Sequence, residues 1–179
     1  MTSPCDPSLA PAGDVSAALM LVDSRLQAIY EGHTGADADA QALTRQLLES
    51  LGRGGARDVL DGMCTLIYVY VCWLREVAED HGKEIVAFLI PSLVETMRMM
   101  PRAFPAPTIP TATALVLAAA TDLSPSLWRT QYGGWTAQEM IPLEATAVLL
   151  AERINRMTDD HDFAARLVTQ LLADVDADS

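Results

Sequence analysis

Positive charge is scarce in this sequence. Twelve lysines and arginines stand against 24 aspartates and glutamates, so the formal net charge is −12 at pH 7. A protein that binds nucleic acid needs a basic face to neutralise phosphates, and an anionic membrane surface repels an acidic chain for the same reason. We therefore expect neither nucleic acid nor a membrane surface as a partner.

Lysine is almost absent, because Lys83 is the only one and the other eleven basic residues are arginines. Together with the abundance of alanine, this bias indicates a high-GC genome such as that of an actinobacterium. The bias bears on the source of the protein and carries no information about a mechanism.

Cysteine is also sparse, with Cys5, Cys64 and Cys72 alone in the chain. On one helix, Cys64 and Cys72 would lie roughly 12 Å apart, which is too far for a disulfide. No Cys/His spacing is typical of a zinc site, and the N-terminus lacks the basic and apolar regions of a secretory signal. This pattern predicts a protein of the reducing cytoplasm.

No hydrophobic run is long enough for a membrane helix. The longest, "MCTLIYVYVCWL" at 63–74, has twelve residues, whereas a transmembrane helix needs about 20. Polar side chains recur through and around it at alternating spacings of three and four, a helical period rather than a strand period. They are Asp58, Asp61, Thr65, Tyr68, Cys72, Arg75 and Glu79. We predict a central helix over about 56–80, with Leu60, Met63, Ile67, Val71 and Leu74 buried and Asp58, Asp61 and Glu79 in solvent.

Runs with the period of a strand are absent as well. Helical periodicity predicts further helices over about 14–31, 37–51, 83–100, 111–123, 136–157 and 159–175, with a short helix starting at Ser124 and Pro125. Pro91 should bend one helix, and "PRAFPAPTIP" at 101–110 should cross the surface in an extended form. The predicted fold is all-α, a single orthogonal or bundle-like domain of six or seven helices. We expect a flexible N-terminal tail over 1–13, the domain over 14–175 and an acidic C-terminal tail over 176–179.

The spacings that define common catalytic sites are missing. His81 and His161 lie beside carboxylates, but no H-x-x-x-H or E-x-x-H accompanies them, and no G-x-S-x-G or phosphate-binding lysine loop is present. We therefore predict no catalytic residue, no cofactor and no metal. "GRGGAR" at 52–57 places arginines before a helix, where an anion can dock, but we favour a flexible connection between helices.

Large adaptable side chains gather in two segments. Methionines cluster at 97–100, where core packing is the simpler interpretation, and "LWRTQYGGW" at 127–135 combines aromatics with a Gly-Gly hinge. Such groups suit a contact surface, although the tryptophans alone can also plug the core. As candidate ligand or partner residues we name Met97, Met100, Trp128, Arg129, Tyr132 and Trp135.

Three functional classes remain open. The first, which we favour, is a non-enzymatic adaptor or regulatory protein that acts through protein contacts as a homodimer. The second is a helical domain that binds a small apolar ligand and lacks a DNA-binding part. The third is an enzyme that uses His81 or His161. A chain that is 50% hydrophobic in only 179 residues motivates the dimer.

Overall fold

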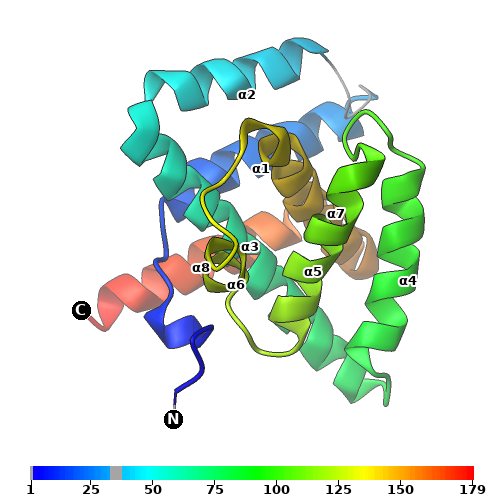
Figure 1. Ribbon diagram of the computed structural model, residues 1–179. Coiled ribbons are helices and arrows are strands. Elements are labelled where there is room, and N and C mark those ends of the chain that lie inside the picture. Colours follow the sequence, from blue (N-terminus) through cyan, green and yellow to red (C-terminus); the bar gives the residue numbers. More distant parts are fainter. Residues whose placement is uncertain (1, 33–37) are drawn as a thin grey trace.

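The computed structural model describes residues 2–32 and 38–179 (Figure 1), and within these ranges it contains eight α-helices and no strand. The all-α prediction is confirmed, with eight helices in the described ranges where a domain of six or seven was expected. The helices are α1 (Val15–Tyr30), α2 (Ala38–Ser50), α3 (Gly52–Asp80), α4 (Ile85–Arg98), α5 (Ile109–Ala120), α6 (Pro125–Thr130), α7 (Met140–Thr158) and α8 (Phe163–Ala177). Three 3-10 turns accompany them: η1 (Pro7–Leu9), η2 (Ala106–Thr108) and η3 (Ala137–Glu139).

Helix α3 is the centre of the fold, as the sequence predicts. It packs against α1, α5 and α7, which surround it (Figure 1). Ile67, Val71 and Leu74 are fully buried, and Leu60 and Met63 are nearly so. The prediction for Asp61 is wrong, because this carboxylate is 4% exposed and accepts a 2.8 Å hydrogen bond from the Ser126 hydroxyl. None of the described helices is long and apolar enough to cross a membrane.

Residues 2–14 lie along the domain and are joined to it by backbone hydrogen bonds. The carbonyl of Cys5 accepts a 2.8 Å hydrogen bond from the amide of Ser124, and Asp14 donates its amide to the carbonyl of Asp58. A Cβ added at Gly62 would stand 2.3 Å from the carbonyl oxygen of Asp14. The absence of a side chain at Gly62 therefore allows this segment to reach α3. The flexibility expected for residues 1–13 stays a prediction.

Several local predictions are confirmed and others need correction. The Ser124 hydroxyl caps α6, and Thr136 and Glu139 form a capping box before α7. The extended crossing expected over 101–110 is wrong, because turns and η2 fold this stretch back and bury Ala103 and Phe104. Helix α8 continues into the expected acidic tail. Helix α4 runs through Pro91 without interruption, and its bend stays a prediction.

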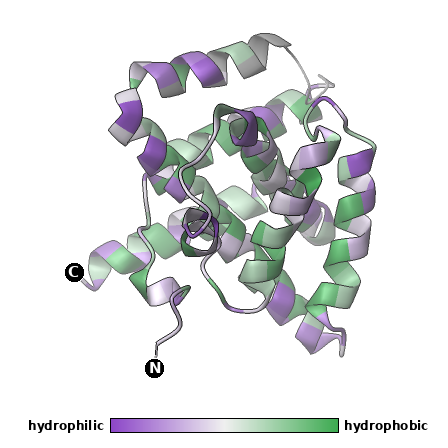
Figure 2. Cartoon of the chain, viewed as in Figure 1, coloured by the Kyte–Doolittle hydropathy of each residue, from purple (hydrophilic) through white to green (hydrophobic). Residues whose placement is uncertain are grey.

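Helix α2 lies on the outside of the fold. It lies along one edge of the molecule (Figure 1), and hydrophilic residues take up much of its length (Figure 2). None of its described side chains is buried. Gly52, with φ +69°, forms the corner between α2 and α3. This geometry leaves space between α2 and the start of α7.

Candidate functional site

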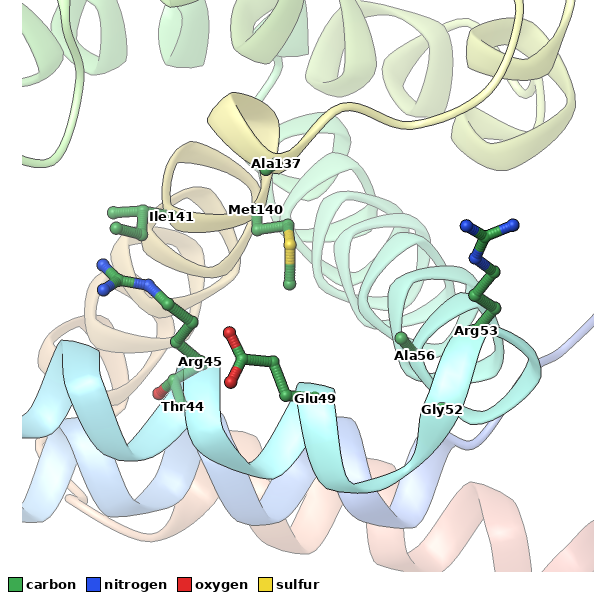
Figure 3. Close-up of a pocket in the computed structure, with 9 residues that line it drawn as sticks. All are labelled: Thr44, Arg45, Glu49, Gly52, Arg53, Ala56, Ala137, Met140 and Ile141. Atoms are coloured by element: carbon green, nitrogen blue, oxygen red, sulfur yellow. The ribbon is translucent and has the colours of Figure 1, made fainter.

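Two joined hollows open where α2, the start of α3 and the start of α7 come together. One, of about 440 Å³, is bordered by α2 and is shown in Figure 3. The other, of about 560 Å³, reaches the 133–136 loop. They share Arg53, Ala56, Ala137 and Met140 as lining residues. We call the two together the basic groove.

The apolar part of the basic groove comes from α3 and α7. Ala56 and Leu60 line it from α3, Met140 and Ile141 from α7, and Trp135 from the preceding loop. In Figure 3 the Met140 side chain points into the space between the helices. This surface can receive an aliphatic group of a ligand or partner.

Among the described residues, the charged residues that line the groove are three arginines and one glutamate. Arg45 and Glu49 rise from α2 toward α7 (Figure 3), and Arg53 and Arg57 stand on the first two turns of α3. All four side chains are exposed. None of the three arginines has a carboxylate within 4.0 Å among the described residues, whereas Arg25, Arg75, Arg129, Arg156 and Arg166 each do. A net positive groove on a chain of charge −12 favours an anionic occupant.

The loop between α6 and η3, residues 131–136, borders the groove through Trp135. Arg129 holds this loop, because its guanidinium donates to both oxygens of Glu139 at 2.7 and 2.6 Å and to the carbonyls of Gly133 and Gly134. The same guanidinium lies over the Trp135 ring, 4.9 Å from its centroid. Arg129 is 6% exposed and therefore supports the loop, whereas we expected it to anchor a partner.

The Glu139 carboxylate is the partner that the Arg129 network depends on. Burial alone raises the pKa of this carboxyl, but the Arg129 hydrogen bonds and the Thr136 amide and hydroxyl outweigh burial and lower the pKa below its ordinary value. The charged form of Glu139 is thus the form that holds the loop.

The remaining predicted site residues are spread over the molecule. Met97 is fully buried, which leaves no surface for a partner and agrees with the core alternative. Met100 lines a different hollow of about 230 Å³, which meets the groove only at Ile141. Trp128 packs against Tyr132 with 5.1 Å between ring centroids, and Tyr132 is 69% exposed. The structure thus does not bring the 97–100 segment and the 127–135 loop into one site.

The two histidines of the enzymatic alternative lie in separate local structures. His81 follows α3 and donates from Nδ1 to the carbonyl of Val77 at 2.8 Å. His161 stacks on Tyr30 with 4.0 Å between ring centroids. Among the side chains that the structure describes, no cluster of three or more His, Cys, Asp or Glu residues is placed to hold a metal ion.

Part of the basic groove is visible in the sequence as a glycine- and arginine-rich stretch, although the stretch alone does not indicate a groove. The stretch "GRGGAR" supplies Arg53, Ala56 and Arg57, and it is helical rather than the flexible connection we favoured. No protein-family model, curated protein or solved structure matches this chain.

Proposed function

We propose that this protein is a non-enzymatic adaptor whose basic groove receives an acidic amphipathic helix of a protein partner. The observation that carries the proposal is the lining: three arginines, none with a carboxylate within 4.0 Å among the described residues, surround an apolar floor of Ala56, Met140 and Ile141. Helices commonly bind in such grooves by laying an apolar face on the floor. Carboxylates flanking that face then meet the arginines.

We further propose that the protein works in the cytoplasm and that it forms a homodimer. The three cysteines are free thiols in the structure, which supports a reducing compartment. The charge of −12 supports a partner that uses protein contacts rather than phosphate contacts.

Fluorescence anisotropy with a designed peptide tests this function. The probe is a fluorescein-labelled 18-residue helix with leucines on one face and glutamates on both flanks. We expect binding to the wild-type protein and a loss of affinity of about tenfold or more in Arg53→Glu with Arg57→Glu, because two exposed ion pairs become repulsions. The matched control is Arg98→Glu with Arg102→Glu, which changes the net charge equally at two exposed arginines outside the groove.

Two results would contradict the proposed function. One is equal affinity in the groove variant and in the control variant. The other is equal affinity for a peptide of the same composition with its leucines scattered around the helix, because the groove must recognise an apolar face.

A small apolar acid is a second candidate occupant. The volume of about 440 Å³ next to α2 lies within the usual range for small-molecule sites. Isothermal titration calorimetry with decanoate distinguishes this candidate. A signal that Met140→Asp abolishes, together with no binding of the designed peptide, would favour the small ligand.

A further inference from the structure

The C-terminal end of α8 is an amphipathic helix without cover in this structure. Of residues 170–179 only Leu172 is half-buried and the others are exposed. Leu171 is 43% exposed and Val175 is 65% exposed, although both are apolar. In Figure 1 this end of α8 extends away from the other helices. Because a short helix is marginal in water on its own, a partner surface would stabilise these turns.

The charged and apolar residues at this end of α8 have the same spacing as those on the α3 face of the basic groove. The groove face of α3 carries the series Arg53, Ala56, Arg57 and Leu60. The end of α8 carries the series Leu171, Asp174, Val175 and Asp178. Both series have steps of three, one and three residues, so members four residues apart are about 6 Å apart along either helix.

An antiparallel alignment of the two series matches every position. Asp178 then faces Arg53, and Asp174 faces Arg57. Val175 meets Ala56, and Leu171 meets the edge of the mostly buried Leu60 that lines the groove, so apolar groups pair with apolar groups. Two cation–carboxylate pairs and two apolar contacts thus share one register.

We propose that the basic groove of one copy of this chain receives residues 171–178 of a second copy. Within one chain α8 packs against α7, α1 and α3, and its last turns project outward (Figure 1). Two copies related by a two-fold axis exchange this contact reciprocally, so each groove is filled. The inference rests on the proposed function of the groove and adds that the chain's own C-terminal helix competes with an external partner.

The test is a charge exchange between two variants of the full chain. The groove variant is Arg53→Glu with Arg57→Glu, and the tail variant is Asp174→Arg with Asp178→Arg. In each variant alone, like charges face each other in the dimer, and we expect the dimer dissociation constant to rise about tenfold or more. In an equal mixture, every reversed groove meets a reversed tail, so multi-angle light scattering should again give twice the mass of 19.3 kDa.

Circular dichroism of each variant provides the folding control, and Arg98→Glu with Arg102→Glu provides the charge control. The inference is overturned if the wild-type chain stays monomeric at 100 μM, if either variant remains as dimeric as the charge control, or if mixing restores no dimer.

The tail variant also separates this inference from the proposed function, because its groove is intact and free of the competing tail. If that variant binds the designed acidic peptide while the wild-type chain is monomeric, the proposed function stands and the dimer contact fails. If the exchange restores the dimer while the peptide fails to bind the tail variant, the contact stands and the external helical partner fails.

Discussion

At the scale of the residue, glycine and small side chains decide where segments can touch. Gly62 faces the carbonyl of Asp14 so closely that a Cβ would stand 2.3 Å from the oxygen. Gly54 lies in the same helix, and a Cβ added there would have no atom of another segment within 4 Å. The two glycines therefore form a matched pair for one experiment.

We expect Gly62→Ala to lower the free energy of unfolding by about 1–3 kcal/mol, because the added methyl group must push the backbone of Asp14 away. Gly54→Ala should raise it by about 0.5–1 kcal/mol, because alanine is the better helix former. Urea denaturation of the two variants measures both values. Equal effects in the two variants would show that residues 2–14 do not pack on α3 in solution.

The buried face of α3 offers a second prediction at this scale. Ile67 is fully buried among core residues. Ile67→Ala should cost about 2–5 kcal/mol of stability, since it removes apolar contacts and leaves a cavity. Denaturation in urea again gives the value, and a loss below about 0.5 kcal/mol is incompatible with this core position.

The burial of single residues was harder to predict from the sequence than the helices were. The polar stripe on α3 predicted a helix correctly, but it placed Asp61 in solvent. Ser126, 65 positions further along the chain, is what hydrogen-bonds and helps to cover that carboxylate. No local spacing contains a contact of that kind, so the periodicity could identify the helix and could not identify every neighbour.

At the scale of the element, the loop before α7 depends on one charged pair. The pKa of Glu139 is lowered in the folded protein, so the unfolded chain takes up the proton first as the pH falls. The stability that this carboxylate contributes is complete above about pH 4.5, its ordinary value, and it is lost as the pH falls through the lower folded value.

We therefore predict that acid weakens the wild-type protein more than Glu139→Gln. The wild-type protein should have the higher melting temperature at pH 7, and the difference should shrink toward pH 3. Thermal unfolding followed by circular dichroism at several pH values measures it. A difference that stays constant between pH 7 and pH 3 would mean that Glu139 does not stabilise the fold through its charge.

Helix α2 is the other element whose behaviour follows from its packing. Because none of its described side chains is buried, few contacts oppose its local opening. We predict that the amides over 44–50 exchange with deuterium faster than those over 63–74 in α3. Mass spectrometry of peptides from the two segments compares the rates, and a bound acidic helix should slow exchange in α2 selectively.

The candidate site was harder to predict than the helices because it forms only where separate helices pack together. The arginines of "GRGGAR" are visible in the sequence, but Met140 and Ile141 join them only through the packing of α7 beside α3. Whether an arginine has a carboxylate partner also depends on the folded surface, so the sequence alone does not show it. The tryptophans of 127–135 were conspicuous in the sequence, yet only Trp135 lines the groove.

At the scale of the whole molecule, the charge distribution is uneven. The chain carries −12 overall, and the described lining of the groove holds three arginines against one glutamate. The proposed dimer brings the acidic end of one copy to the basic groove of another. Exposed ion pairs of this kind are screened by salt.

We predict that raising NaCl from 50 to 500 mM weakens the dimer about three- to tenfold. Sedimentation velocity over a range of protein concentrations measures the dissociation constant. The tail variant should respond in the opposite sense, because salt screens its repulsion. An affinity of the wild-type dimer that does not change with salt would indicate an interface without the arginine–aspartate pairs.

The single lysine gives the molecule a natural attachment point for a reporter. Lys83 follows the C-terminus of α3 and lies over the Phe88 ring. The basic groove lies at the N-terminus of that same helix, and a helix of 29 residues is about 43 Å long. A fluorophore attached to the Lys83 amine would therefore sit far from the groove, and energy transfer between two labelled copies would report the geometry of their pairing without occupying the surface that forms it.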